Sequence, residues 1–205
     1  MLILRKGIMP FALAVATLFI VRCAGPTRTV QRVQVDQSMD ISGRWNDTDS
    51  RLTAQSMVKN ILSSPWLQNF IDENGRKPRV IVGKVRNKTS EHLDTEVFIK
   101  DIEKELINSG MVTFVASGKE RKEIRQERLD QQSYASVETA KELANELAAD
   151  FILQGAIYSV VDSFEGKKVV LYKVNLELID IENNAKVWVG DKQIKKFIQQ
   201  EKYTW

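Results

Sequence analysis

Cysteine and histidine are almost absent from this chain, which has one residue of each among 205. That leaves little for the usual catalytic triads, no internal disulfide bond and no second histidine to share a zinc ion. Proline and glycine are also sparse, with four and ten residues scattered along the chain, which excludes a low-complexity scaffold. We therefore expect one ordinary domain that folds by packing its apolar side chains.

An excess of charge of one sign is also missing. Lysine and arginine number 30 against 27 aspartates and glutamates, and the two signs are interspersed along the chain. A nucleic-acid-binding domain would show a one-sided basic footprint instead, and no phosphate-binding glycine loop or calcium-loop spacing occurs in the sequence. We predict a protein that has no nucleic-acid partner, no cofactor, no metal and no enzymatic activity.

The one long apolar run lies near the N-terminus, from Ile8 to Val21, after a short positive head. It spans about 14 residues, fewer than the ~18 to 20 that a membrane-spanning helix needs, and this layout is typical of a signal peptide. Cys23 closes the segment as in the lipobox of bacterial lipoproteins, although Arg22 stands where that motif usually has a small residue. We predict a signal peptide at 1–22 and lipidation of Cys23; the alternative is an uncleaved anchor or an ordinary signal.

The segment that follows is polar and has no sustained helical period, so residues 23–41 are predicted to be a lipidated, flexible tether. Acyl chains on the cysteine would hold the protein on a membrane. Ala24 occupies the position at which an aspartate could act as a retention signal, which favours the outer membrane, facing the periplasm, over retention in the inner membrane. Residues 42–205 are predicted to form the globular domain.

Within this domain, helical and strand periodicities alternate. We expect helices from about residue 50 to Ser64-Pro65 and at 95–109, 118–129 and 137–149. We expect strands at 79–86, 112–115, 151–161, 172–178 and 186–194. The 151–161 segment is apolar at both parities, as a central strand covered on both faces would be, and the last strands alternate as in an antiparallel meander. The fold class expected is α+β, a single mixed, largely antiparallel sheet of about five strands flanked by helices.

Two polar segments are candidates for recognition. Trp45 follows Arg44 just before the first helix, and the loop 87–94 joins a strand to a helix. The alternative for Trp45 is a hydrophobic plug at the domain edge, and a lone histidine in such a loop is more often a surface residue than a metal ligand. The C-terminal aromatics Tyr203 and Trp205 are further candidates. The predicted partner-binding residues are Arg44, Trp45, Asn87, Thr89, Glu91 and His92.

Several stretches, taken in order, resemble the LpoB-type penicillin-binding protein activators. Among them are SGRWNDTDSRL, PRVIVGKVRNKTSEH and ELAADFILQGAI, and the resemblance runs from about Asp40 to Lys196. It implies an outer-membrane lipoprotein whose domain is similar to the N-terminal domain of TolB. Members of that family stimulate a bifunctional class A penicillin-binding protein by docking on a small accessory domain.

The expected function is therefore that of a non-enzymatic activator of peptidoglycan synthesis, acting as a monomer. The alternative is a structural or adaptor subunit of an outer-membrane or periplasmic assembly, because one fold can serve several functions. A ring-forming subunit would run as a large oligomer.

Overall fold

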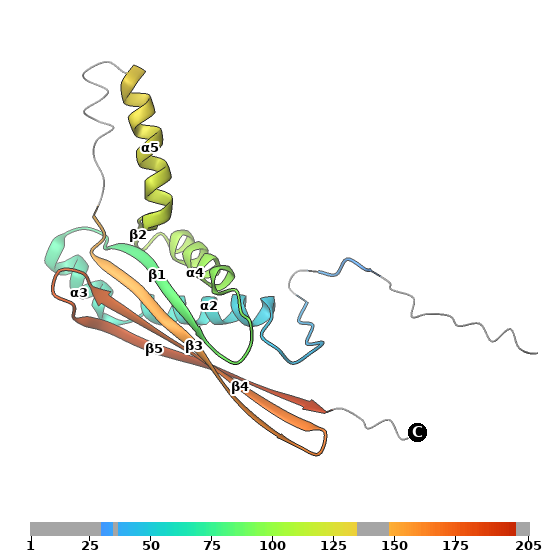
Figure 1. Ribbon diagram of the computed structural model, residues 1–205. Coiled ribbons are helices and arrows are strands. Elements are labelled where there is room, and N and C mark those ends of the chain that lie inside the picture. The colour runs from blue at the N-terminus through green and yellow to red at the C-terminus, as the bar shows by residue number, and fades with distance from the viewer. Residues whose placement is uncertain (1–29, 35–36, 135–147, 200–205) are drawn as a thin grey trace, which may run out of the picture. The chain divides into compact units, whose positions relative to one another are not determined.

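The structure is a computed structural model that describes residues 30–34, 37–134 and 148–199 (Figure 1). The folded unit that carries all described helices and strands begins at Ser38. The predicted signal peptide, Cys23 and the C-terminal Tyr203 and Trp205 lie outside the described residues. Among the helices that are described, none combines the length and the apolar character needed to cross a bilayer.

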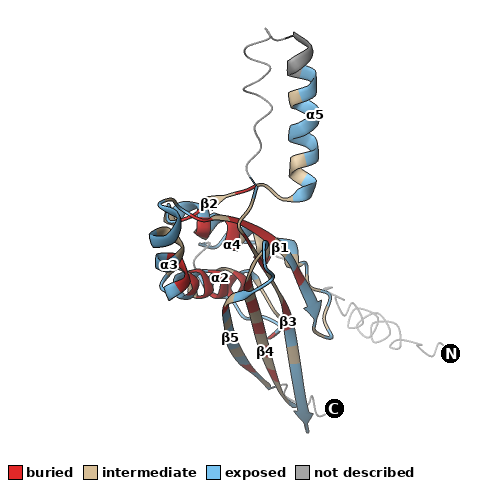
Figure 2. Cartoon of the chain, turned by 90° about the vertical axis from the view of Figure 1, so that its left-hand side faces the viewer, coloured by how far each residue is buried: buried red, intermediate tan, exposed pale blue. Residues whose placement is uncertain are grey.

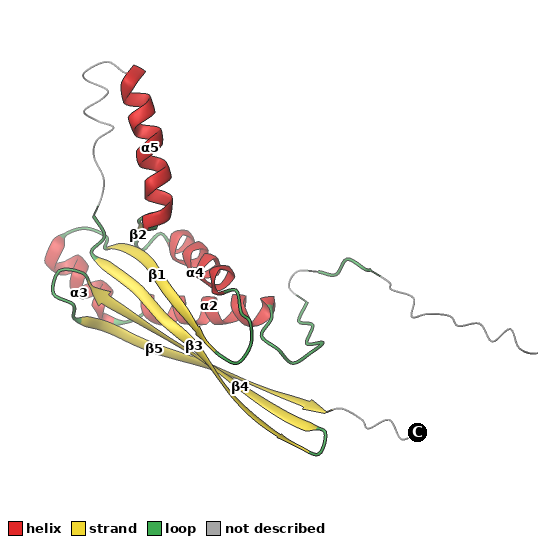
Figure 3. Ribbon diagram, in the orientation of Figure 1, coloured by secondary structure: helices red, strands yellow, loops and turns green. Residues whose placement is uncertain are grey.

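Five strands form one mixed sheet in the order β2-β1-β3-β4-β5 (Figure 3). Their bounds are β1 Arg79–Lys88, β2 Thr113–Phe114, β3 Phe151–Phe164, β4 Lys167–Asp180 and β5 Lys186–Gln199. β1 pairs in parallel with β2 and β3, whereas β3, β4 and β5 form a long antiparallel meander. The predicted α+β fold with a mixed, largely antiparallel sheet is confirmed.

Four helices are described, namely α2 Asp47–Leu62, α3 Pro65–Asn74, α4 Thr95–Ser109 and α5 Gly118–Tyr134. Asn46 and Asp49 form a capping box that starts α2, and Gly110, with a φ of 62°, ends α4. Helix α3 was not predicted from the sequence. Pro65 does end α2, but it also opens the next helix at its first position, where a missing N–H costs no hydrogen bond.

The core lies between the sheet and the helices α2, α3 and α4. The apolar stripes predicted for α2 and α4 are buried against the inward-facing residues of β1, β3 and β4. Two tryptophans of this core form hydrogen bonds through their indole N–H groups. Trp66 donates to the Ile61 carbonyl at 2.7 Å, and Trp188 donates to Asn60 Oδ1 at 3.0 Å. The stripes consist of Ala54, Met57, Val58 and Ile61 on α2 and of Phe98, Ile102 and Leu106 on α4.

One expectation for β3 is wrong. The strand is central in the sheet, as predicted, but in the described part of the chain its second face is open over its far half, where Tyr158 is 45% and Val160 is 65% exposed. Apolar residues at both odd and even positions of β3 therefore do not mean that helices cover both faces of its far half. The helix predicted at 137–149 falls outside the described residues except for its last two, Ala148 and Ala149, which are not helical.

Candidate partner-binding site

The two predicted recognition segments, far apart in the sequence, are joined through one buried tyrosine on β4. The Trp45 amide donates to Tyr172 Oη at 3.1 Å and to Glu91 Oε2 at 3.4 Å. Tyr172 Oη in turn donates to Glu91 Oε1 at 2.7 Å. Burial, and then the neighbouring Glu91 carboxylate, raise the pKa of Tyr172, so the phenol keeps the proton that it donates. The segment before α2 and the loop after β1 thus form one hydrogen-bonded unit.

The Trp45 side chain packs at the edge of the core. Its ring meets those of Tyr172 and Phe98 edge-on, with centroids 5.6 and 6.1 Å away. The residue is half-buried, whereas its neighbour Arg44 is exposed. The indole therefore lies where the plug interpretation expected it, with the exposed Arg44 next to it in the chain.

The predicted loop 87–94 begins with the last two residues of β1, Asn87 and Lys88, and the turn that follows is held in shape by its own side chains. Asn87 Oδ1 accepts from the Thr89 amide at 2.9 Å, and Asn87 Nδ2 donates to the Glu91 carbonyl at 2.7 Å. Thr89 Oγ1 accepts from the Glu91 amide at 3.1 Å. Such side-chain bonds replace the backbone bonds that a loop lacks. His92 is exposed at the end of this ordered turn.

A buried lysine of β5 fixes the segment that precedes α2. Lys196 Nζ donates to Asp40 Oδ1 and Asp49 Oδ2, both at 2.5 Å, and to the Arg44 carbonyl at 3.0 Å. Burial acts to lower the pKa of Lys196, but the two carboxylates outweigh it and raise that pKa. The hydrogen bond from Lys196 lowers the pKa of Asp40. Asp40, predicted to lie in the tether, is therefore hydrogen bonded to the sheet.

Sequence reasoning missed both Tyr172 and Lys196 as members of this site. Strand parity could have indicated them. Tyr172 alternates with polar residues along β4 and lies on its buried side, and Lys196 shares a side of β5 with Ile194 and Ile198. A lysine at an inward position needs a buried acidic partner, which here is Asp49.

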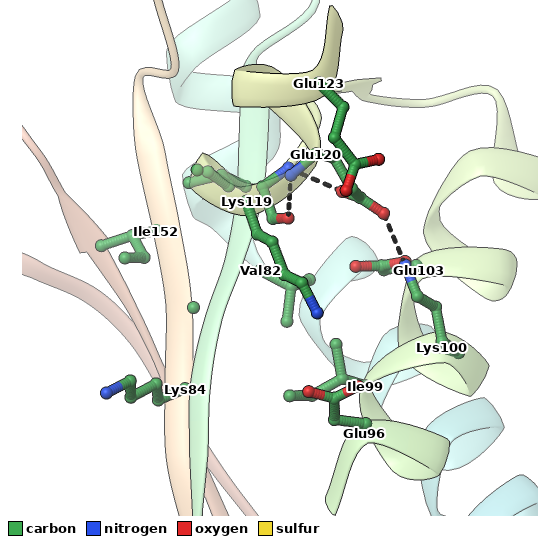
Figure 4. Close-up of a pocket in the computed structure, with 14 residues that line it drawn as sticks. Val82, Lys84, Glu96, Ile99, Lys100, Glu103, Lys119, Glu120, Glu123 and Ile152 are labelled. Atoms are coloured by element: carbon green, nitrogen blue, oxygen red, sulfur yellow. Dashed lines mark hydrogen bonds and ion pairs between the residues drawn. The ribbon is translucent and has the colours of Figure 1, made fainter.

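A separate groove lies between β1, α4 and the start of α5 (Figure 4). Lys100 Nζ donates to Glu103 at 2.6 Å and to Glu120 at 2.8 Å. The Lys100 ammonium and the Ser117 amide lower the pKa of Glu120 to about 2. These carboxylates are paired rather than poised for acid–base chemistry. Among the described residues, no three acidic, histidine or cysteine side chains cluster as a metal site would require.

The chain was compared with known families, sequences and structures. The family model described as "Peptidoglycan-synthase activator LpoB" matches residues 49–194, from α2 into β5. No curated protein sequence gives a match. Among solved structures, the LpoB C-terminal domain from Salmonella enterica matches at 18% identity, over 74% of this chain and 99% of that one, with a TM-score of 0.41.

The LpoB C-terminal domain from Escherichia coli matches at 15% identity, over 72% of this chain and 99% of that one, with a TM-score of 0.42. The NMR structure of E. coli LpoB matches at 18% identity, over 86% of this chain and 83% of that one, with a TM-score of 0.41. The family model covers well over half of the residues, including strands β1 to β4 and the first part of β5. This chain therefore belongs to the LpoB family of peptidoglycan-synthase activators.

Proposed function

We propose that this protein binds a class A penicillin-binding protein and makes it polymerise and crosslink peptidoglycan faster, without chemistry of its own. The observation that carries the proposal is the match of the LpoB family model over residues 49–194. An activator of this kind changes its partner by binding alone. It therefore needs a surface that binds the active state of the synthase more tightly than the inactive state.

The joined Trp45 and 87–94 segments are suited to that task. Their shape is set by hydrogen bonds within the domain, so little conformational entropy would be lost on binding. We assign the contacts to the exposed side chains of Arg44, Asn87 and His92. Trp45, Thr89 and Glu91 would hold the backbone that carries these side chains in place.

We also propose that Cys23 carries the lipid anchor and that the domain faces the periplasm from the outer membrane. The hydrogen bond from Lys196 to Asp40 would then mark the end of the tether. The residues from the cysteine to Asp40 could reach at most ~60 Å when fully extended at ~3.3 to 3.6 Å each. The synthase would therefore have to project toward the outer membrane to be reached.

The test uses the full chain, purified in detergent, and the class A synthases of the organism that carries it. Binding is measured by surface plasmon resonance, and glycan polymerisation is followed on lipid-linked substrate. We expect saturable binding and a faster polymerisation rate. An Arg44→Glu/His92→Glu double variant should weaken both, whereas Lys59→Glu, an exposed change on α2, should not. Absence of binding and stimulation would contradict the proposal, and a large homo-oligomer without synthase binding would favour the assembly subunit.

A further inference from the structure

The sheet face opposite α2 and α4 carries an apolar patch over the far halves of β3, β4 and β5. We call it the distal patch. Val160 lies opposite Leu171, and Val169 lies opposite Phe197, so the patch is continuous across three strands. Val160, Phe164 and Phe197 are 65%, 75% and 62% exposed. The residues of the patch are Tyr158, Val160, Phe164, Val169, Leu171 and Phe197.

This patch departs from the pattern of a solvated sheet face. Nearer the helices, the same face of β4 carries Lys173, Asn175 and Glu177, as a wet face should. Beyond Lys173 it turns apolar, and Figure 2 shows the far end of β3 exposed. The patch is centred ~30 Å along β3 from Phe151, where the chain enters the strand. A contiguous apolar surface of this kind usually marks a binding site.

The charges around the distal patch are mainly basic. Lys88 and Lys173 flank Tyr158 on the neighbouring strands, Lys195 lies opposite Leu171, and Lys167 lies opposite Phe164. Lys173 has an ion pair with Asp191 at 3.8 Å, and Asp162 is the acidic residue inside the patch. The described residues thus surround an apolar centre with more positive than negative charge, which suits an acidic partner surface.

Two other occupants fit these charges less well. A second copy of the chain would bring one set of lysines against the same set, which like-charge repulsion disfavours. An anionic membrane would attract the lysines, but Asp162 and Glu165 stand beside Phe164 at the tip of the hairpin. Insertion of that tip would bring both carboxylates into a negatively charged interface.

We propose that the distal patch is the apolar centre of the docking surface and that it receives an acidic, partly apolar surface of a protein partner. The inference rests on the proposed function, and the partner is the synthase named there. The patch reaches the sheet edge at which the 87–94 segment leaves β1, because Lys88 pairs with Tyr158. The Ser90 amide donates to Ser159 Oγ at 3.4 Å on the other face of the sheet, so the loop turns away from the patch. Lys88, at the end of β1, would then contribute to the rim of this interface.

The test compares Phe197→Ser with Val189→Ser in the full chain. Both residues lie on the same face of β5 and are similarly exposed, at 62% and 56%, but Val189 is far from the patch. We expect Phe197→Ser to weaken synthase binding about tenfold and Val189→Ser to change it less than about twofold. Lys195→Glu should also weaken binding and reduce its dependence on salt. Circular dichroism and thermal unfolding of each variant verify that the fold is intact.

The outcomes separate this inference from the proposed function. If the unchanged chain binds and activates the synthase but Phe197→Ser binds equally well, the distal patch is not the docking surface, while the proposed function stands. If the unchanged chain does not bind the synthase, both fail. The inference is also overturned if Phe197→Ser abolishes only sedimentation with phosphatidylglycerol vesicles, or only self-association, and leaves synthase binding intact.

Discussion

Replacing Lys196 with methionine should destabilise the domain strongly. The lysine is 9% exposed, and its ammonium donates hydrogen bonds to the carboxylates of Asp40 and Asp49 and to the Arg44 carbonyl oxygen. The Asp49 side chain is also 9% exposed, so the substitution leaves a buried carboxylate without its cation. Removing one member of a buried ion pair typically costs about 3 to 5 kcal/mol. Asp40, whose side chain is 51% exposed, can be solvated instead and adds little to that cost.

We therefore expect Lys196→Met to lower the free energy of unfolding by about 3 kcal/mol. Urea unfolding followed by tryptophan fluorescence measures this change. Lys195→Met, at the exposed neighbouring position, is the matched control and should stay within about 0.5 kcal/mol. Adding Asp49→Asn to Lys196→Met removes the orphaned charge and should restore at least ~1 kcal/mol.

A loss below about 1 kcal/mol for Lys196→Met would refute this reasoning, because the pair would then behave as a surface ion pair. A double variant no more stable than Lys196→Met would place the cost in lost packing rather than in the unpaired carboxylate. The lysine stays charged over the physiological range, since its raised pKa means that its contribution is lost only above its unfolded value of about 10.4.

Further predictions concern the hydroxyl of Tyr172, one glycine and one carboxylate. Tyr172→Phe removes the hydroxyl shared by Trp45 and Glu91 and should cost about 1 to 3 kcal/mol by thermal unfolding, with a shift in tryptophan emission; an unchanged stability and spectrum would contradict the linkage. Gly155→Ala places a Cβ 2.0 Å from the Asn175 carbonyl oxygen and should cost about 3 kcal/mol, whereas Gly118→Ala, where the Cβ meets nothing within 4 Å, should be nearly neutral in the same assay. The pKa of Glu120 is lowered to about 2, so its stabilisation is present above its ordinary pKa and is lost as the pH falls toward 2. Because its side chain is 40% exposed, Glu120→Gln should cost less than about 1 kcal/mol at pH 7 and should reduce the acid dependence of unfolding; an unchanged acid dependence would count against the ion pair with Lys100.

Much of the fold was accessible from local patterns. The stripe at Phe98, Ile102 and Leu106, with Asp94 before it and Gly110 after it, predicted α4 at its observed bounds. The alternation along β4 and the asparagines before Lys186 predicted the meander, and Asn184 does adopt a φ of 64°. These features depend on neighbours in the sequence, which is why sequence reasoning found them.

The parts that were missed depend on distant residues. The hydrogen bonds of Lys196 join residues about 150 positions apart, so no local window could contain both partners. The same holds for Tyr172, which links Trp45 to Glu91. The exposed second face of β3 was missed for another reason, since apolar residues on both parities do not reveal whether a helix or a partner covers the outer side.

The most direct test of the central claim is the glycan polymerisation rate of a class A penicillin-binding protein, measured as the full chain is titrated into the reaction. We expect a saturable increase in rate whose midpoint agrees with the dissociation constant measured for the same pair, and a shift of both values together in the Arg44→Glu/His92→Glu variant. A rate that stays flat across concentrations at which the two proteins would meet in the envelope would contradict it.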